Sequence, residues 1–164
     1  GKATTATPGP ASSGRKGTTS FSINGTAVTQ NHEDTEPGIN YNISNRNMSL
    51  YLFGDVASQP CSGMLQISKA PFDLKPGTYD CAAGFTRYTQ VDGGGQNINY
   101  HGKSFSVTFT RIDPTGDKRV WLASGTFSGE LPLGVYEKPG ISDAMLKITD
   151  GKFNNIRLTQ LGNP

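Results

Sequence analysis

Residues 120–158, VWLASGTFSGELPLGVYEKPGISDAMLKITDGKFNNIRL, decide the fold class. Alternate positions in the first part of this stretch carry apolar or small residues, which are Trp121, Ala123, Gly125, Phe127 and Gly129. This period of two is typical of a strand with one buried face. The alternation returns at residues 145–149 and 153–158, on either side of Asp150-Gly151, and predicts a hairpin. The stretch is therefore expected to form a meander in which a long strand is followed by a hairpin.

The composition of the whole chain agrees with a β protein. Its 164 residues suit a single domain, and 34% hydrophobic residues with 21 glycines fit thin layers of sheet better than packed helices. No window repeats apolar residues at the i, i+3, i+4, i+7 spacing over three turns. We expect residues 18–164 to form one all-β domain, an antiparallel β-sandwich or partly closed barrel of about ten strands.

Short turn signals divide this domain into strands. Asn24-Gly25 predicts a type I′ hairpin turn. Pro76-Gly77 predicts a type II turn with a positive φ at the glycine. Glycines at positions 93–95 predict a loop, and residues 97–101 and 103–113 are expected to form separate strands.

Alternation also predicts the core of the C-terminal half. One face of residues 103–113 and the matching faces of the later strands carry large apolar residues. The residues expected in one core are Phe105, Val107, Phe109, Trp121, Phe127, Leu146, Ile148, Phe153 and Ile156.

Residues 1–17, GKATTATPGPASSGRKG, are expected to form a flexible tether. They include no large apolar residue, so burial cannot offset the entropy lost on ordering. Such a leader is typical of a lipoprotein that has lost its lipidated cysteine, of the mature start of a secreted protein, or of a cloning remnant. No apolar run approaches the ~20 residues of a membrane-spanning helix. Membrane contact is therefore expected only through an N-terminal lipid anchor that this chain does not include.

The charge argues against one class of partner. A formal net charge of +2 arises from 15 basic and 13 acidic residues spread along the chain. Nucleic-acid binding needs a denser basic stripe to neutralise phosphates. The balance predicts solubility and no nucleic-acid partner.

The two cysteines, Cys61 and Cys81, are expected to form a disulfide if the protein is exported. The bridge would close a loop of about 20 residues and contribute roughly 3 kcal/mol in the loop-entropy model. The alternative is two buried thiols that are not joined.

Three segments resemble a known family. KPGTY at 75–79, SGTFS at 124–128 and ITDGKF at 148–153 follow one another with the order and spacing found in uncharacterised Bacteroidetes lipoproteins of the DUF6252 type. Residues 104–113 take the place of the family's long strand, and the resemblance spans roughly residues 20–158. It implies an exported, lipid-anchored β-sandwich of the bacterial cell envelope, in the outer membrane or periplasm or outside the cell. It supplies no catalytic residues.

Two groups of residues are candidate binding sites. Four aromatic residues are candidates for a carbohydrate platform, because exposed rings stack on sugars: Trp121, Tyr88, Tyr100 and Tyr136. A place in the core is the alternative for Trp121. Three carboxylates in one predicted loop are suitable hard ligands for calcium: Glu33, Asp34 and Glu36. The alternative for these is a solvated acidic loop.

The sequence predicts no catalytic group. His32 and His101 are expected to be ordinary loop or surface residues. The sequence has no Gly-x-Ser-x-Gly elbow that would supply a nucleophile for either histidine to activate. The glycine loop at 92–95 lacks the lysine and helix of a phosphate site.

These observations favour an exported, non-enzymatic binding or assembly module with a protein or glycan partner in the envelope, as part of a larger assembly. One alternative is a carbohydrate-active hydrolase that uses loop carboxylates. Another is an inhibitor or immunity protein that blocks another protein's active site.

Overall fold

The computed structural model describes residues 17–31, 38–56, 59–71, 73–91, 94–135, 137 and 143–163. These residues contain nine strands and no helix, which confirms the all-β prediction. The strands are β1 (Thr18–Ile23), β2 (Thr26–Asn31), β3 (Ile39–Asn42), β4 (Asn47–Val56), β5 (Gln59–Ile67), β6 (Gly77–Val91), β7 (Gly94–Pro114), β8 (Val120–Pro132) and β9 (Met145–Leu161). The predicted tether lies outside the described residues except for Gly17.

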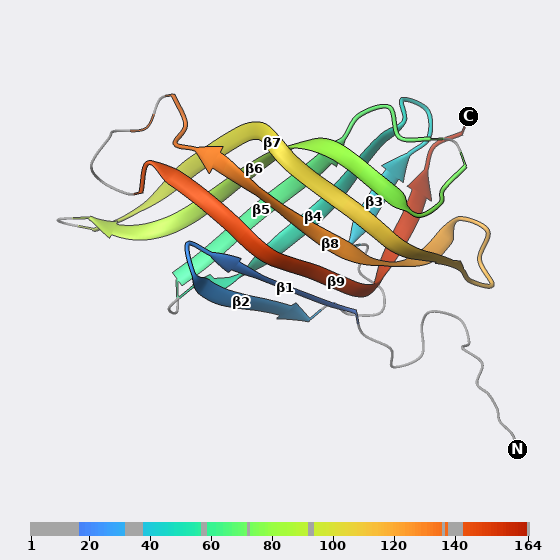
Figure 1. Ribbon diagram of the computed structural model, residues 1–164, viewed down its shortest axis with the longest axis horizontal. Coiled ribbons are helices and arrows are strands. Elements are labelled where there is room, and N and C mark those ends of the chain that lie inside the picture. Colours follow the sequence, from blue (N-terminus) through green and yellow to red (C-terminus); the bar gives the residue numbers. More distant parts are fainter. Residues whose placement is uncertain are drawn as a thin grey trace, which may run out of the picture.

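All nine strands belong to one hydrogen-bonded sheet in the order β2-β1-β9-β3-β4-β5-β6-β7-β8. An additional pairing of β8 with β9 closes the seven strands from β3 to β9 into a barrel (Figure 1). Closure satisfies both edges of these strands over much of their length. Of the two expected architectures, the structure therefore shows the barrel and gives no support to the sandwich.

One edge of β9 is shared by two strands. β1 pairs with residues 148–154 of β9, and β3 pairs with residues 158–161. The ladder between β3 and β9 is parallel, whereas the other ladders between the described strands are antiparallel. The β1–β2 hairpin is thus added to the barrel wall beside β3.

The hairpin predicted at Asp150-Gly151 is wrong. Both residues lie inside β9, which runs without interruption for 17 residues. Phe127 of β8 pairs with Gly151, and Gly129 pairs with Ile148, so β9 has one residue more than β8 between these pairs. Asp150, at a φ of 53°, is part of this β-bulge. The bulge bends the strand around the barrel instead of reversing it.

Other turn predictions had mixed outcomes. The Asn24-Gly25 turn is confirmed, with φ of 46° and 88° as a type I′ turn requires. The type II turn at Pro76-Gly77 is wrong, because Gly77 begins β6 and is not among the described glycines with positive φ. The separate strands expected at 97–101 and 103–113 are one strand, β7.

The predicted core is confirmed, with one exception. Eight of the nine residues are less than 5% exposed, and Trp121 is partly buried against them. Their rings pack together: the centroids of Phe109 and Phe153 are 5.6 Å apart, and those of Phe127 and Phe153 are 6.3 Å apart. Such aromatic pairs add stability beyond their buried area.

Inward-facing glycines make room for these rings. Five described glycines lie directly across a ladder from a phenylalanine, and in four of these pairs the ring lies over the glycine: Gly63 with Phe85, Gly125 with Phe153, Gly129 with Phe105 and Gly151 with Phe127. A Cβ on any of the four would come within 2.7 Å of the ring opposite it. A ring that covers the backbone of a glycine fills the space that the missing side chain leaves. Part of the glycine content therefore serves the core and not the turns.

The barrel end at which β9 terminates is closed by the connection between β5 and β6. The buried Ala70 donates its N–H to the carbonyl oxygen of Arg46 over 2.8 Å. The Tyr41 hydroxyl, inside the barrel, donates to the carbonyl oxygen of Pro71 over 2.7 Å. Burial raises the pKa of Tyr41.

The end at which β9 begins is closed by the segment that follows β8. The buried Tyr100 donates its hydroxyl to the carbonyl oxygen of Asp143 over 2.8 Å. The Asn24 amide donates to the Asp143 carboxylate over 2.8 Å, and Arg87 lies 3.6 Å from the same oxygen. This end is thereby joined to the β1–β2 turn.

Candidate functional site

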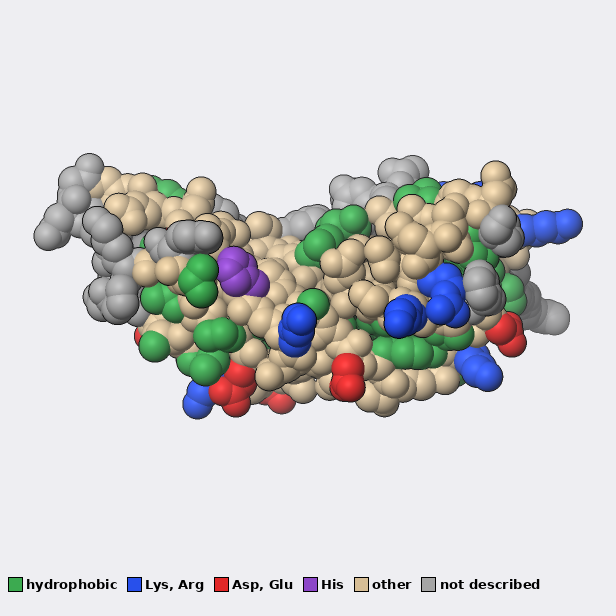
Figure 2. Space-filling model, turned by 90° about the horizontal axis from the view of Figure 1, so that it is seen from above, with side chains coloured by type: hydrophobic (Ala, Val, Ile, Leu, Met, Phe, Trp, Pro, Cys, Tyr) green, Lys and Arg blue, Asp and Glu red, His purple; other side chains and the backbone are tan. Residues whose placement is uncertain are grey.

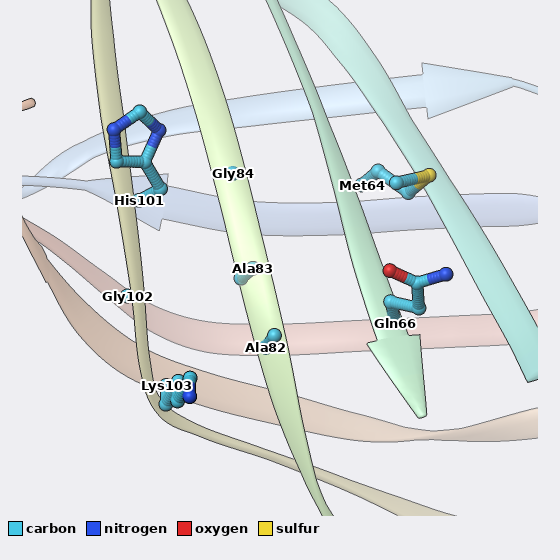
Figure 3. Close-up of a pocket in the computed structure, with 8 residues that line it drawn as sticks. All are labelled: Met64, Gln66, Ala82, Ala83, Gly84, His101, Gly102 and Lys103. Carbon is cyan, nitrogen blue, oxygen red and sulfur yellow. The ribbon is translucent and has the colours of Figure 1, made fainter. Parts of the chain in front are cut away.

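A groove of about 430 Å³ lies on the outer face of β5, β6 and β7 (Figure 3). Its lining residues are Met64, Gln66, Ala82, Ala83, Gly84, His101, Gly102 and Lys103. A volume of this size is within the range of small-molecule binding sites. We refer to these eight residues as the groove.

Small residues of the central strand form the floor of the groove. Ala82 and Gly84 occupy alternate positions of β6, so both face outward, where other positions of this strand carry Thr86 and Tyr88. Side chains of β5 and β7 stand on either side of this floor (Figure 3). Because β5 and β7 are two strand spacings apart, the two rows are about 10 Å apart from axis to axis.

A β-bulge shapes the wall on β7. Cys81 pairs with Phe105, and Ala83 pairs with Gly102, so two residues of β7 lie opposite Ala82 alone. Those two residues, Lys103 and Ser104, are both exposed. A bulge changes the direction of side chains locally. It places Lys103 at the rim while Tyr100 and Phe105 both remain in the core.

The walls offer several kinds of noncovalent contact. Exposed His101 and Lys103 present an imidazole and an ammonium group from β7, and half-buried Met64 and Gln66 present a thioether and an amide from β5. The eight described lining residues include no carboxylate, hydroxyl or thiol on the groove face. Cys81, which precedes Ala82 in β6, is buried on the inner face of the sheet. The arrangement can hold a ligand by apolar contact and hydrogen bonds.

Charges around the groove are nearly balanced. Asp80 precedes Ala82 by two residues on the same face of β6 and is exposed. Glu130 of β8 is also exposed, and its carbonyl oxygen would lie 3.9 Å from a Cβ at Gly102. Lys103 therefore lies in a region that also contains carboxylates, and charge alone does not select the ligand.

The structure does not bring together the three described members of the predicted aromatic set, Tyr88, Tyr100 and Trp121. Tyr100 is fully buried and Trp121 is partly buried against the core. Tyr88 pairs with Asn97 near the start of β7, whereas Trp121 pairs with Pro114 at the end of that strand. Tyr136 lies outside the described residues. The described members of the set cannot form a single sugar platform.

The predicted calcium ligands Glu33, Asp34 and Glu36 lie outside the described residues, as does His32. Among the described residues, no three His, Cys, Asp or Glu side chains are grouped closely enough to hold a metal ion. His101, expected on the surface, is exposed and lines the groove.

The disulfide predicted between Cys61 and Cys81 is absent, and this prediction is corrected. Cys61 of β5 pairs with Arg87, which is six residues beyond Cys81 along β6. Six strand residues span about 20 Å, whereas a disulfide needs Cα atoms closer than about 7 Å. Both cysteines are buried. Burial, and secondarily the charge of Asp80, raises the pKa of Cys81 to about 12.

Sequence reasoning missed the groove as a site. The signal was present in the run Ala82-Ala83-Gly84, because the alternate positions on either side of it carry the larger residues Asp80 and Thr86. Nothing in that run indicates that Met64 and His101 stand beside it.

Comparisons of the chain with protein-family models, with curated proteins and with solved structures found no match.

Among the described residues, no helix has the length and apolar character needed to cross a membrane.

Proposed function

We propose that this protein is a non-enzymatic binding module of the bacterial cell envelope and that the groove is its recognition surface. One observation supports the proposal: Ala82 and Gly84 are the outward-facing residues of β6 at this level of the sheet, and they lie between two rows of larger side chains on β5 and β7.

The chemistry of the lining favours binding over turnover. A hydrolase acting on glycans needs two carboxylates at a defined separation, and a nucleophilic enzyme needs a base beside its nucleophile. The described groove residues supply donors, an acceptor and apolar contact instead. The envelope location in this proposal is supported by the resemblance of residues 20–158 to exported lipoproteins.

A groove-filling substitution tests the proposal. A Cβ at Gly84 would meet only the Tyr100 carbonyl oxygen, at the ordinary distance of 3.8 Å, so Gly84→Phe should fold and fill the channel. Gly116→Phe is the matched control, because a Cβ at Gly116 has no neighbour within 4 Å and the site is in the β7–β8 connection. The wild type and both variants are compared on a glycan array and in affinity capture from the native envelope after detergent solubilisation, so that no membrane surface contributes to capture.

The expected result is at least a tenfold loss of the captured ligand for Gly84→Phe and none for Gly116→Phe. Equal retention by the two variants would place recognition elsewhere on the molecule. Hydrolysis of a bound glycan would favour the enzyme alternative, and its loss on replacing Glu33 or Glu36 would establish it.

A further inference from the structure

We propose that the barrel end at which β9 terminates docks on an anionic membrane surface through its exposed lysines, Lys69, Lys75 and Lys118. We call this surface the lysine end. The proposal is independent of the groove, which lies on the barrel wall.

The charges of the two barrel ends differ. The described connections β3–β4, β5–β6 and β7–β8 meet at the lysine end and carry five cations and two carboxylates, a formal net charge of +3. These are Arg46, Lys69, Lys75, Lys118 and Arg119, with Asp73 and Asp117. At the opposite end, residues 24–25, 133–135, 137 and 143–144 carry two carboxylates and no cation. Figure 2 shows Lys and Arg side chains gathered towards the right-hand end, where Figure 1 places the end of β9.

Neighbouring apolar residues direct the lysines of the β5–β6 connection outward. Ala70 is 1% exposed and fills the barrel mouth, while the adjacent Lys69 is exposed. Leu74 packs against the core, while the adjacent Lys75 is exposed. The connection therefore buries its apolar residues in the barrel and presents its ammonium groups to the outside.

Near this end, Arg119 and Arg111 already have intramolecular partners, and Arg46 is half-buried. The Arg119 guanidinium donates to the carbonyl oxygen of Gly162 over 3.0 Å and to Asn163 Oδ1 over 3.1 Å. Arg111 is paired with Asp113 at 2.6 Å. The available cations are consequently lysines, which act as point charges and do not make the bidentate contacts by which arginine recognises single phosphates.

The shape of this end favours a surface over an enclosed ligand. The cavity beneath Leu74 and Lys75 has a volume of about 10 Å³, which is no larger than one water molecule requires. Lysines on separate connections would reach different headgroups of one membrane plane. All of them need to come within about a Debye length, roughly 10 Å at 0.1 M salt, of that plane. The three lysines lie on connections that meet at one end of the barrel, so a plane facing that end is the surface that all of them can approach together.

Vesicle sedimentation tests the proposal with two double variants of equal net charge. Lys75→Gln/Lys118→Gln removes charge from the lysine end, and Lys147→Gln/Lys152→Gln removes it from exposed positions of β9 on the barrel wall. Each lysine near an anionic surface contributes roughly fivefold to binding, so the first pair should weaken binding on the order of 30-fold. The second pair should change it less than about threefold, because those lysines are farther from the plane.

Binding is measured to phosphatidylcholine vesicles with and without phosphatidylglycerol, at low and physiological salt. The proposal predicts binding only to vesicles that contain phosphatidylglycerol. Salt should weaken this binding, and Lys75→Gln/Lys118→Gln should weaken it more than Lys147→Gln/Lys152→Gln. Equal losses for the two pairs would show that net charge alone is responsible and would overturn it. Absence of binding to anionic vesicles would also overturn it, as would preferential binding to soluble polyglutamate.

Discussion

Gly151 of β9 and Phe127 of β8 face each other so closely that a Cβ on the glycine would lie 2.3 Å from the Phe127 carbonyl oxygen and 2.5 Å from its ring. Real Cβ contacts are essentially never shorter than 3.0 Å. The glycine is therefore required by packing inside a continuous strand, where the Asp-Gly pair had suggested a turn.

Gly151→Ala should lower the free energy of unfolding by about 3 kcal/mol, because a backbone oxygen cannot move aside as a flexible side chain does. Gly84→Ala is the control: its Cβ would have no neighbour closer than 3.8 Å, so a change within about 0.5 kcal/mol is expected. Urea denaturation midpoints compare the two. Similar stability of both variants would contradict the register of β8 against β9.

Phe127→Ala should cost about 3–5 kcal/mol through lost burial and the cavity left behind. Phe127 is 3% exposed and its ring lies near those of Phe21, Phe105 and Phe153. Thr126→Ala, on the exposed face of the same strand, should cost less than about 1 kcal/mol. Denaturant unfolding provides the measurement, and a cost at Thr126 equal to or above that at Phe127 would contradict the assignment of the inner and outer faces of β8.

The Asn24 side chain should stabilise the junction of β1 with β9. Its amide donates to Asp143 over 2.8 Å, and its Oδ1 accepts the Lys147 N–H over 2.7 Å. Asn24→Gly keeps the positive φ and loses these bonds, so a cost of about 1–2 kcal/mol is expected. Asn24→Ala should cost about 1 kcal/mol more, since alanine resists the left-handed conformation. Thermal unfolding that found the alanine variant the more stable one would contradict this assignment.

The Cys81 thiol should make stability depend on alkaline pH. Its pKa is raised from 9.0 to about 12 in the folded protein, chiefly by burial, so the unfolded state loses the proton first as pH rises. Stability from this group is fully present below pH 9 and should fall between pH 9 and 12. The pH dependence of urea midpoints, compared between the wild type and Cys81→Ala, measures the effect. Identical profiles for the two proteins would contradict it.

The cysteines should also both react as thiols once the protein unfolds. Mass spectrometry after alkylation in urea, without reductant, is expected to show two labels per chain, because Cys61 and Cys81 are six positions out of register. The folded protein should label slowly, since both residues are buried. A species that carries no label in urea would indicate that the two cysteines are joined by a disulfide.

Local chemistry was sufficient for part of this fold. Alternation with a period of two identifies the inward faces of Phe105, Val107 and Phe109, because side-chain direction in a strand depends only on the chain itself. The Asn24-Gly25 turn was predictable for a similar reason, since both residues tolerate positive φ without help from distant contacts.

Tertiary structure decided the features that depend on which strands become neighbours. Asp150-Gly151 became a bulge because β8 continues alongside β9, and the barrel closes because β3 pairs with the last residues of β9, more than 100 positions later in the chain. The groove has the same origin: Ala82 and Gly84 form a floor only because the registers of β5 and β7 set larger side chains on both sides of them. The alternation within one strand determines which of its faces is buried. Which distant strand it pairs with depends on the packing of the whole core, so the sequence of one strand does not predict that partner.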